Sequence, residues 1–209
     1  MKQSLFRKLT NKKLSTISLS GAVLDIGGSH DASYHKLFQG DYTVTAVNIQ
    51  KDTDPDVVLD IDTEKLPFND ESYDAVLLIN LLEHVYDYKH VLSESYRVLK
   101  QEGKLIAVVP FLYYIHPSPN DYFRYSKQAL KKILADNNFS SVEVIGIGCG
   151  AFSASHNLLH RFFPSFVSVP FEWFARGIDI FLRKSAQLLG KKYDGTEYAL
   201  GYVVTAQKK

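Results

Sequence analysis

The segment PFLYYIHPSPNDYFRYS, residues 110–126, concentrates side chains that could carry proton-transfer and binding chemistry. Five of them are candidate catalytic residues: His116, Asp121, Tyr122, Arg124 and Tyr125. His116 could act as a general base near neutral pH, and Arg124 could hold an anionic group. The alternative is a buried aromatic turn in which Arg124 pairs with Asp121. We predict that the five side chains line a substrate pocket.

A second candidate site lies in VLDIGGSHD, residues 23–31, at the end of a predicted strand. Gly27 and Gly28 would let the backbone approach a ligand closely, and Asp25 could orient the loop or accept a hydrogen bond from an ammonium group. In open α/β sheets, ligands bind beyond the carboxyl ends of the strands, beside the first strand. A tight strand-to-helix turn would use the same residues, so this loop alone leaves both interpretations open.

These loops must be positioned by a sheet, because short apolar runs alternate with helical patterns along the chain. We predict seven strands, over residues 22–26, 42–49, 56–61, 73–80, 104–111, 140–148 and 199–207. We predict helices over 31–39, 88–100 and 126–139, the last with Ser126 as its N-cap. This order favours a Rossmann-like, doubly wound and mostly parallel sheet with helices on both faces. The last strand is predicted to be antiparallel.

Two further segments extend this pattern. Residues 1–20 are typical of a short amphipathic helix with Leu5, Phe6 and Leu9 on one side, and they lack the apolar stretch of a signal peptide. Residues 151–194 form a helical, Phe-rich insertion before the last strand, longer than ordinary connections. Aromatic stripes of this kind are most often core. A substrate wall, a dimer interface and a membrane-surface contact are the alternatives.

Composition limits the classes of function. The 209 residues suit a single domain, and 24 Lys and Arg against 23 Asp and Glu give a net charge of +1. We therefore expect no nucleic-acid partner. The one cysteine excludes an internal disulfide framework and a multi-cysteine zinc site, which fits a cytoplasmic protein without a metal. No apolar stretch is long enough for a membrane span.

The stretches VLDIGG, DIDTEKLPFNDESYDAVLLINLLEHV and YRVLKQEGKLIAVVP occur in this order. Together they resemble the class I S-adenosylmethionine-dependent methyltransferases, in particular the type 11 group. The resemblance covers about Val23 to Pro110, and HPSPNDYFRYS extends it to a subset of that group. It implies S-adenosylmethionine as cofactor, S-adenosylhomocysteine as product, and a small or medium-sized acceptor, with an acidic acceptor suggested by Arg124.

The resemblance also implies which residues meet the cofactor: Asp25, Gly27, Gly28, Asn48, Ile49, Asp62, Asn80, Leu81 and Glu83. Asn48 falls where the family usually has an acid that bridges the ribose hydroxyls. Asp62 matches the acid that meets the adenine amino group, with Asp60 as the alternative. His84 is interpreted as structural or adjacent to the cofactor.

Several departures from the family pattern keep a second function open. Ser29 replaces the second glycine of the loop, KQEG replaces a Pro-Gly-Gly turn, and Asn48 lacks the charge that strengthens a hydrogen bond. The alternative is therefore a noncatalytic protein that binds S-adenosylmethionine or S-adenosylhomocysteine. A nicotinamide dehydrogenase is disfavoured, because the third glycine of its fingerprint and the acid at position 48 are missing. The absence of a Walker loop leaves phosphoryl transfer without support.

Overall fold

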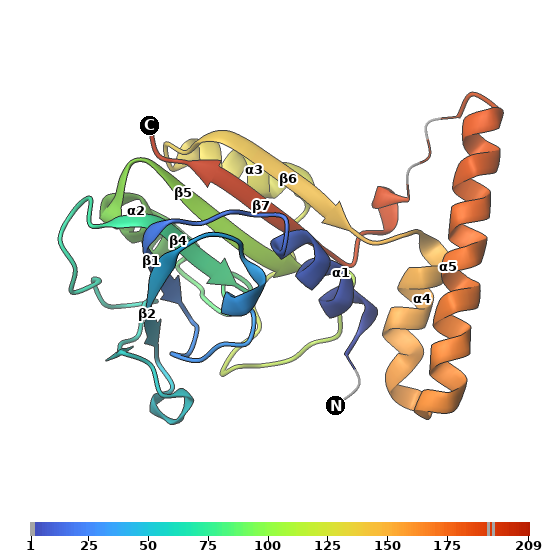
Figure 1. Ribbon diagram of the computed structural model, residues 1–209, viewed down its shortest axis with the longest axis horizontal. Coiled ribbons are helices and arrows are strands. Elements are labelled where there is room, and N and C mark those ends of the chain that lie inside the picture. The colour runs from blue at the N-terminus through green and yellow to red at the C-terminus, as the bar shows by residue number, and fades with distance from the viewer. Residues whose placement is uncertain (1–2, 192, 194) are drawn as a thin grey trace.

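The computed structural model describes residues 3–191, 193 and 195–209, which fold around a seven-stranded sheet (Figure 1). Its strands are β1 (Gly21–Ile26), β2 (Tyr42–Asn48), β3 (Val57–Val58), β4 (Tyr73–Ile79), β5 (Leu99–Pro110), β6 (Ser140–Ile147) and β7 (Gly201–Gln207). Their order in space is β3-β2-β1-β4-β5-β7-β6. Strand β7 is antiparallel to β5 and β6, and the other pairs are parallel. The predicted sheet class and its antiparallel last strand are confirmed.

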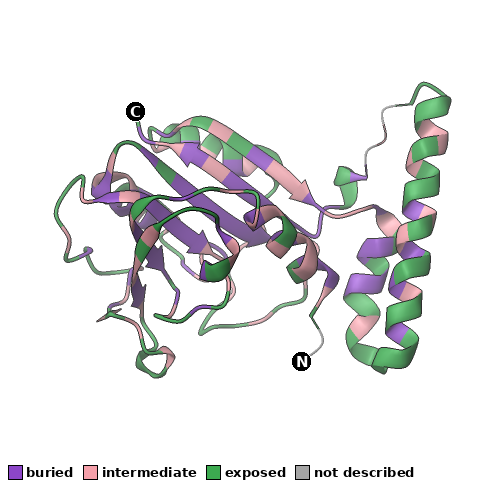
Figure 2. Cartoon of the chain, viewed as in Figure 1, coloured by how far each residue is buried: buried purple, intermediate pink, exposed green. Residues whose placement is uncertain are grey.

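The two faces of the sheet are covered by separate apolar clusters. Helices α2 (Tyr88–Val98) and α3 (Lys127–Asp136) pack on one face through residues such as Leu92 and Leu130. Helix α1 (Leu5–Leu14) packs on the other through Leu5, Phe6 and Leu14. Figure 2 shows that the strands between them are mostly buried. Burial on both faces explains the nearly continuous apolar run of β4.

The predicted N-cap of α3 is confirmed. The hydroxyl oxygen of Ser126 accepts a hydrogen bond from the backbone N–H of Ala129, 3.2 Å away. This bond satisfies one of the amide groups that the first turn of a helix leaves without a partner. The start of α3 is therefore set by a local cap as well as by the spacing of its apolar residues.

The predicted helix over residues 31–39 is wrong. The chain makes only a short 3-10 turn there, at His35–Leu37. Tyr34 and His35 direct their polar groups to the buried Asp25, and Phe38 packs in one apolar cluster with residues of α1. Tertiary contacts thus override the local helical pattern. The predicted strand over 56–61 is also shorter, at Val57–Val58.

The insertion before β7 forms a helical hairpin that stands beside the sheet (Figure 1). It consists of α4 (Ala151–Leu159) and α5 (Ser165–Leu188). Residues 192 and 194 of the predicted insertion lie outside the described residues. The expectation that its aromatic stripe is core is wrong, because Phe166, Trp173 and Phe181 are 80%, 71% and 67% exposed. Among the described residues, no helix has the length and apolar character needed to cross a membrane.

Candidate active site

Two neighbouring cavities open at the carboxyl ends of the parallel strands. The first, which we call the edge cavity, measures about 280 Å³ and is lined by residues at or just after the ends of β1, β2 and β4, among them Gly27, Asn48 and Leu81. The second, the α1 cavity, measures about 320 Å³ and lies beneath helix α1. Asn80, His84 and Ser118 line both cavities. A ligand in one cavity would therefore lie next to a ligand in the other.

The backbone at two strand ends shapes the edge cavity. Gly27 follows β1 with φ +87°, and Asn80 follows β4 with φ +53°. A Cβ atom at Gly27 would lie 2.9 Å from Cδ1 of Leu81. Left-handed backbone is uncommon for residues other than glycine, and it concentrates at functional sites. Both residues line the edge cavity.

Asp25 supports the loop from beneath and does not line either cavity. Its side chain is fully buried, and Oδ2 accepts hydrogen bonds from Oη of Tyr34 at 2.6 Å and Nε2 of His35 at 2.7 Å. A Cβ atom at Gly28 would lie 1.9 Å from the same oxygen. Asp25 and Gly28 thus hold the loop in position, and their contact with the cofactor stays a prediction.

Asn48 ties the end of β2 to the same loop. Its Nδ2 donates to the carbonyl oxygens of Gly27 and Gly28, each at 2.9 Å, and its Oδ1 accepts from the N–H of Gln50 at 3.0 Å. An aspartate could not donate these two bonds. The asparagine therefore has a local reason to replace the acid that the family usually carries.

Two acids line the edge cavity and differ in how far their oxygens are engaged. The oxygens of Asp62 accept from the N–H groups of Asp87 at 2.7 Å and Tyr86 at 3.2 Å. Oδ1 of Asp60 accepts from the N–H of Asp62 at 3.0 Å. Both acids remain candidates for a ligand contact, and Asp62 also holds the loop after β4. Ile49 and Leu81 supply apolar lining beside them.

Among the five predicted catalytic residues, His116 lines the α1 cavity. Arg124 instead donates to both carboxylate oxygens of Asp121, with Nη2 to Oδ2 at 2.7 Å, and also to the carbonyl of Tyr114 at 3.0 Å. These hydrogen bonds from Arg124 lower the pKa of Asp121 to about 2. The prediction of a free anion clamp at Arg124 is wrong, because its guanidinium is committed to this buried carboxylate.

The two tyrosines among the predicted catalytic residues, Tyr122 and Tyr125, line neither cavity. Tyr125 is buried, and its hydroxyl donates to the carbonyl of Leu82 at 3.2 Å. Tyr122 is exposed, and its ring packs against that of Tyr86 at a centroid distance of 5.4 Å. Pocket lining by all five side chains is therefore corrected to His116 alone, with Asp121 accepting from its backbone N–H at 2.8 Å.

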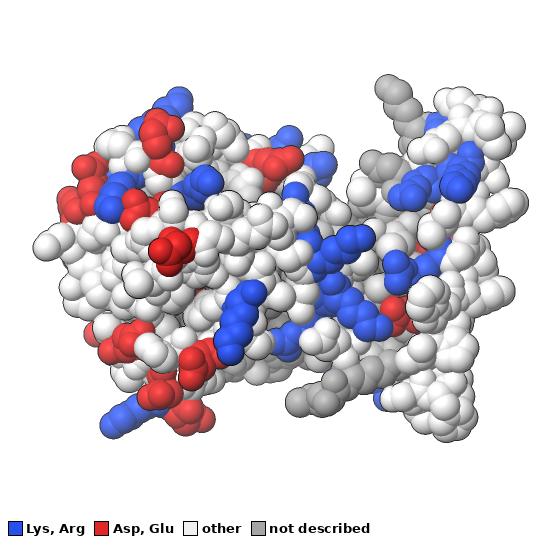
Figure 3. Space-filling view, viewed as in Figure 1, with Lys and Arg blue, Asp and Glu red and all other residues white. Residues whose placement is uncertain are grey.

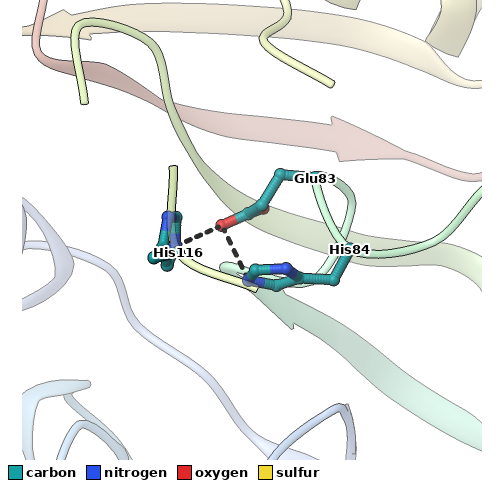
Figure 4. A group of neighbouring side chains, drawn as sticks. All are labelled: Glu83, His84 and His116. Atoms are coloured by element: carbon teal, nitrogen blue, oxygen red, sulfur yellow. Dashed lines mark ion pairs between the residues drawn. The ribbon is translucent and has the colours of Figure 1, made fainter. Parts of the chain in front are cut away.

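Glu83 is absent from the lining of the edge cavity, and its predicted contact with the cofactor stays a prediction. Its fully buried carboxyl points toward two histidines (Figure 4), with Oε1 3.7 Å from Nε2 of His84 and 3.9 Å from Nε2 of His116. Burial raises the pKa of Glu83 to about 8 and lowers the pKa of His84. The Glu-His pair was visible in the sequence, but its meeting with His116 depends on the loop after β5.

Helix α1 contributes lining that sequence reasoning missed. The α1 cavity is bordered by Arg7, Thr10 and Asn11 from this helix, and by Tyr34 and Tyr113 from two loops. Burial raises the pKa of Tyr113 to about 12. The amphipathic pattern predicted the apolar side of α1, but no local signal indicated what its polar side would face.

Comparisons with known proteins show which sequences and folds this chain resembles. Residues 24–107 match the family model described as Methyltransferase domain. Over 77 residues, 35% of this chain and 31% of the relative, the sequence is 39% identical to the ubiquinone/menaquinone biosynthesis C-methyltransferase of Desulfotalea psychrophila. The matched stretch thus spans less than a third of that relative's length.

Solved structures share the fold over nearly the whole chain. A SAM-dependent methyltransferase from Archaeoglobus fulgidus has a TM-score of 0.60 at 17% identity, covering 97% of this chain and 94% of that one. Phosphoethanolamine N-methyltransferase 2 of Haemonchus contortus, in complex with S-adenosyl-L-methionine, has a TM-score of 0.55 at 17% identity, with coverages of 97% and 52%. Residues 24–107 of this chain are thus similar to a methyltransferase domain, and the chain shares its fold with solved methyltransferases.

Proposed function

We propose that this protein binds S-adenosylmethionine in the edge cavity and transfers its methyl group to a small molecule in the α1 cavity. The observation that carries the proposal is the shared wall of the two cavities, formed by Asn80, His84 and Ser118. Methyl transfer requires the donor and the acceptor to meet in line, and two adjoining cavities provide that arrangement. The methyltransferase domain match covers the residues that form most of the edge cavity.

The residues of the edge cavity fit the proposed cofactor. Gly27 offers close backbone approach at the end of β1, and Asp60 or Asp62 offers a carboxylate for an amino or hydroxyl group. Ile49 and Leu81 offer apolar surface for an aromatic base. Ligand sites commonly combine apolar lining with a few polar groups that fix orientation. The donor set therefore suits a nucleoside with a polar tail.

The bound cofactor would supply an activated methyl group. The residues of this chain would therefore mainly orient the two reactants and exclude water from them. Positioning of two reactants can lower a barrier by roughly 7 to 11 kcal/mol. His116 faces the α1 cavity and could accept a proton from an acceptor hydroxyl. The noncatalytic alternative predicts the same cofactor binding without turnover.

The α1 cavity suggests the character of the acceptor. Its lining combines apolar residues, including Phe6 and Leu14, with the guanidinium-bearing Arg7. We infer an acceptor with an apolar body and an anionic or oxygen-bearing group near Arg7. The Desulfotalea psychrophila relative is named for ubiquinone and menaquinone biosynthesis, and a quinone precursor has this general character.

Binding and turnover are tested separately. Calorimetry with S-adenosylhomocysteine should show one site per chain, and radiolabelled S-adenosylmethionine should transfer its methyl group to a member of a phenol and quinol panel. Arg7→Ala should raise the KM for that acceptor, while Lys12→Ala, an exposed cation on the same helix, should not. Absence of S-adenosylhomocysteine binding would overturn the proposal. Binding without turnover on the panel would favour the noncatalytic alternative.

A further inference from the structure

Three potential metal ligands converge at the wall between the two cavities. Glu83, His84 and His116 each place one donor atom so that all three atoms lie within 4.8 Å of one another. Figure 4 shows both imidazole rings directed at the same carboxylate oxygen. The distances from Oε1 to the two Nε2 atoms, 3.7 and 3.9 Å, are too long for hydrogen bonds. They are compatible with atoms that share a central ion at ordinary ligand distances near 2 Å.

Contacts behind the rings select the tautomers that bind metals. Nδ1 of His84 lies 2.6 Å from the carbonyl oxygen of Asn120, and Nδ1 of His116 lies 3.1 Å from that of Tyr114. Because a carbonyl oxygen can only accept, each Nδ1 carries the proton when the ring is neutral. Each Nε2 then presents a lone pair toward Glu83. Metal-binding histidines usually donate their other ring N–H in this way.

The carboxyl of Glu83 has an unusual environment. It is fully buried, and neither of its oxygens has a hydrogen-bond partner among the described residues. Burying such a group without a partner costs free energy, more for a charged group than for a neutral one. We propose that Glu83, His84 and His116 bind a divalent transition-metal ion. A cation there would partner the buried carboxylate and both lone pairs at once.

The ligand set indicates the class of metal. Two imidazoles and one carboxylate suit Zn²⁺, Fe²⁺, Mn²⁺ or Co²⁺ better than Mg²⁺ or Ca²⁺, which prefer oxygen ligands. Three protein ligands leave a position open, as catalytic zinc sites do. Because His84 borders both cavities and His116 borders the α1 cavity, that position would be accessible to an acceptor.

A bound metal would define the acceptor more closely, and this part rests on the proposed function. An acceptor hydroxyl oxygen at the open position would be polarised by the ion, which favours loss of its proton to water and the nucleophilic form. In the metal-bound protein the ion would thus replace His116 as the group that promotes deprotonation, because Nε2 of His116 would bind the ion. The acceptor would then be an oxygen-bearing molecule such as a phenol or an enol. Carbon or nitrogen acceptors without a ligating oxygen would gain nothing from the ion.

The test uses tag-free protein and the metal alone. Calorimetry with Zn²⁺ should give one site per chain, and Co²⁺ should give the visible absorption bands of a protein-bound ion. Glu83→Gln and His116→Ala should each weaken Zn²⁺ binding at least about tenfold, as loss of a ligand should exceed loss of a supporting contact. His30→Ala is the matched control, since His30 is an exposed histidine paired with Asp56 elsewhere. Circular dichroism would check that every variant is folded.

Equal Zn²⁺ affinity in wild type, Glu83→Gln and His116→Ala would overturn the metal site. The same samples are titrated with S-adenosylhomocysteine, so that the two proposals can fail separately. Retained S-adenosylhomocysteine binding without Zn²⁺ binding overturns the metal site and spares the proposed function. Zn²⁺ binding without S-adenosylhomocysteine binding overturns the proposed function and spares the metal site.

A different observation concerns the hairpin of α4 and α5. In its long helix α5, polar residues lie on the buried face and large apolar residues on the exposed face. Its buried face carries Ser168, Glu172, Ala175 and Asp179, at helical spacing. Its exposed face carries large apolar side chains: Phe166, Trp173, Phe174, Ile180, Phe181 and Leu188. Monomeric proteins rarely leave a contiguous apolar surface of this kind uncovered. The exposed face therefore requires a partner.

The charges of the hairpin indicate which partner. Its two acids face inward, where Glu172 pairs with Lys8 at 2.8 Å and Asp179 accepts from the N–H groups of Phe152 and Ser153. The remaining charged residues of 151–191 are all Lys or Arg: Arg161, Arg176, Arg183, Lys184 and Lys191. Figure 3 shows blue side chains and wide uncharged surface on this part of the molecule. A second copy would bring the same positive charge, whereas anionic lipid would be attracted.

The structure points to an anionic bilayer surface as the occupant of the exposed face of α5. Helices with Trp, Phe and Leu on one side and flanking Lys and Arg lie in the membrane interface, where apolar burial and attraction to anionic lipid act together. The helix would lie along the surface with Phe166 and Phe181 inserted.

The single tryptophan is a built-in reporter, because Trp173 lies on the exposed face. Vesicles of equal phosphatidylglycerol and phosphatidylcholine should shift its emission to the blue, and pure phosphatidylcholine should do so far less. Phe166→Ser combined with Phe181→Ser retains the reporter and should lower partitioning at least about tenfold. Val58→Ser, which changes an exposed apolar residue on β3, should have no effect.

Charge reversal by Arg183→Glu and Lys184→Glu should also reduce binding to the anionic vesicles. Absence of an emission shift with either vesicle would overturn the membrane proposal. So would light scattering that shows a dimer in wild type and a monomer in the Phe166→Ser, Phe181→Ser variant, because a second copy would then cover the face.

Discussion

Replacing Gly28 with alanine should disrupt a hydrogen-bonded carboxylate beneath the cofactor loop. The added Cβ atom would lie 1.9 Å from Oδ2 and 2.4 Å from Cγ of Asp25, and 2.8 Å from Oη of Tyr34. Gly28 is outside the left-handed region, so the effect is steric and not a matter of backbone strain. Either the loop or the Asp25 side chain must move.

The magnitude follows from the bonds that hold Asp25. Its Oδ2 accepts from Tyr34 and His35, and the residue is fully buried. Hydrogen bonds to charged groups contribute about 1.5 to 3 kcal/mol each, so losing both would cost roughly 3 to 6 kcal/mol. A small shift of the loop would recover part of this, and we expect a loss of about 3 kcal/mol. For a chain of this length that corresponds to a fall in Tm of roughly 6 to 12 °C.

Urea unfolding and thermal unfolding would measure the loss, and calorimetry with S-adenosylhomocysteine would measure binding by the folded fraction. Binding should weaken too, because Asn48 holds the carbonyl of Gly28. Gly177→Ala is the matched control, since a Cβ there meets nothing within 4 Å and the site is inside α5. It should stabilise the protein by up to about 1 kcal/mol. A Gly28→Ala stability within about 0.5 kcal/mol of wild type, the usual range for neutral surface substitutions, would refute the reasoning.

Three further predictions concern Asn48 and two acids of the edge cavity, and Arg97 of helix α2, which lines neither cavity. Asn48→Asp should weaken S-adenosylhomocysteine binding measured by calorimetry, by roughly 1 to 2 kcal/mol, because both bonds to the loop carbonyls are lost; tighter binding would show that the charge outweighs the tether. Asp60→Ala should weaken that binding without lowering Tm. Asp62→Ala should weaken binding and also lower Tm, since Asp62 holds the backbone of residues 86–87. Identical effects of the two variants would contradict the different roles given to these acids. Arg97→Ala should destabilise the fold in urea by about 3 kcal/mol or more, because the buried Glu94 loses its cation; an unchanged midpoint would contradict this.

The sheet was predictable because its determinants are local. Apolar runs such as that of β4 and the Ser126 cap operate within a few residues of the chain. The loop carrying Gly27 was also predictable, since its position at the end of the first strand follows from the fold class. The helix expected over 31–39 failed because its polar residues satisfy Asp25, a partner that lies in β1.

The acceptor side was less predictable, because it depends on residues that meet only after folding. Arg124 and Asp121 were recognised as a candidate pair, but the sequence could not decide between that pair and a free clamp. The meeting of His116 with Glu83 joins the loops after β5 and β4. The lining from α1 comes from residues about a hundred positions before His116 in the chain. Such contacts leave no periodic signal.

The position of β7 bears on how the protein is made on the ribosome. Strand β7 lies between β5 and β6, yet it is synthesised after the whole α4–α5 hairpin. Strand β6 pairs with β7 alone in the sheet order, so it has no neighbour until β7 emerges. The nascent chain therefore carries an unpaired edge on β5, and a second on β6, while β7 is still inside the exit tunnel and the first part of the aromatic hairpin has left it. Unpaired edges and exposed apolar surface are the features that promote misassembly during folding. A chaperone bound to the hairpin would protect the nascent protein during this interval.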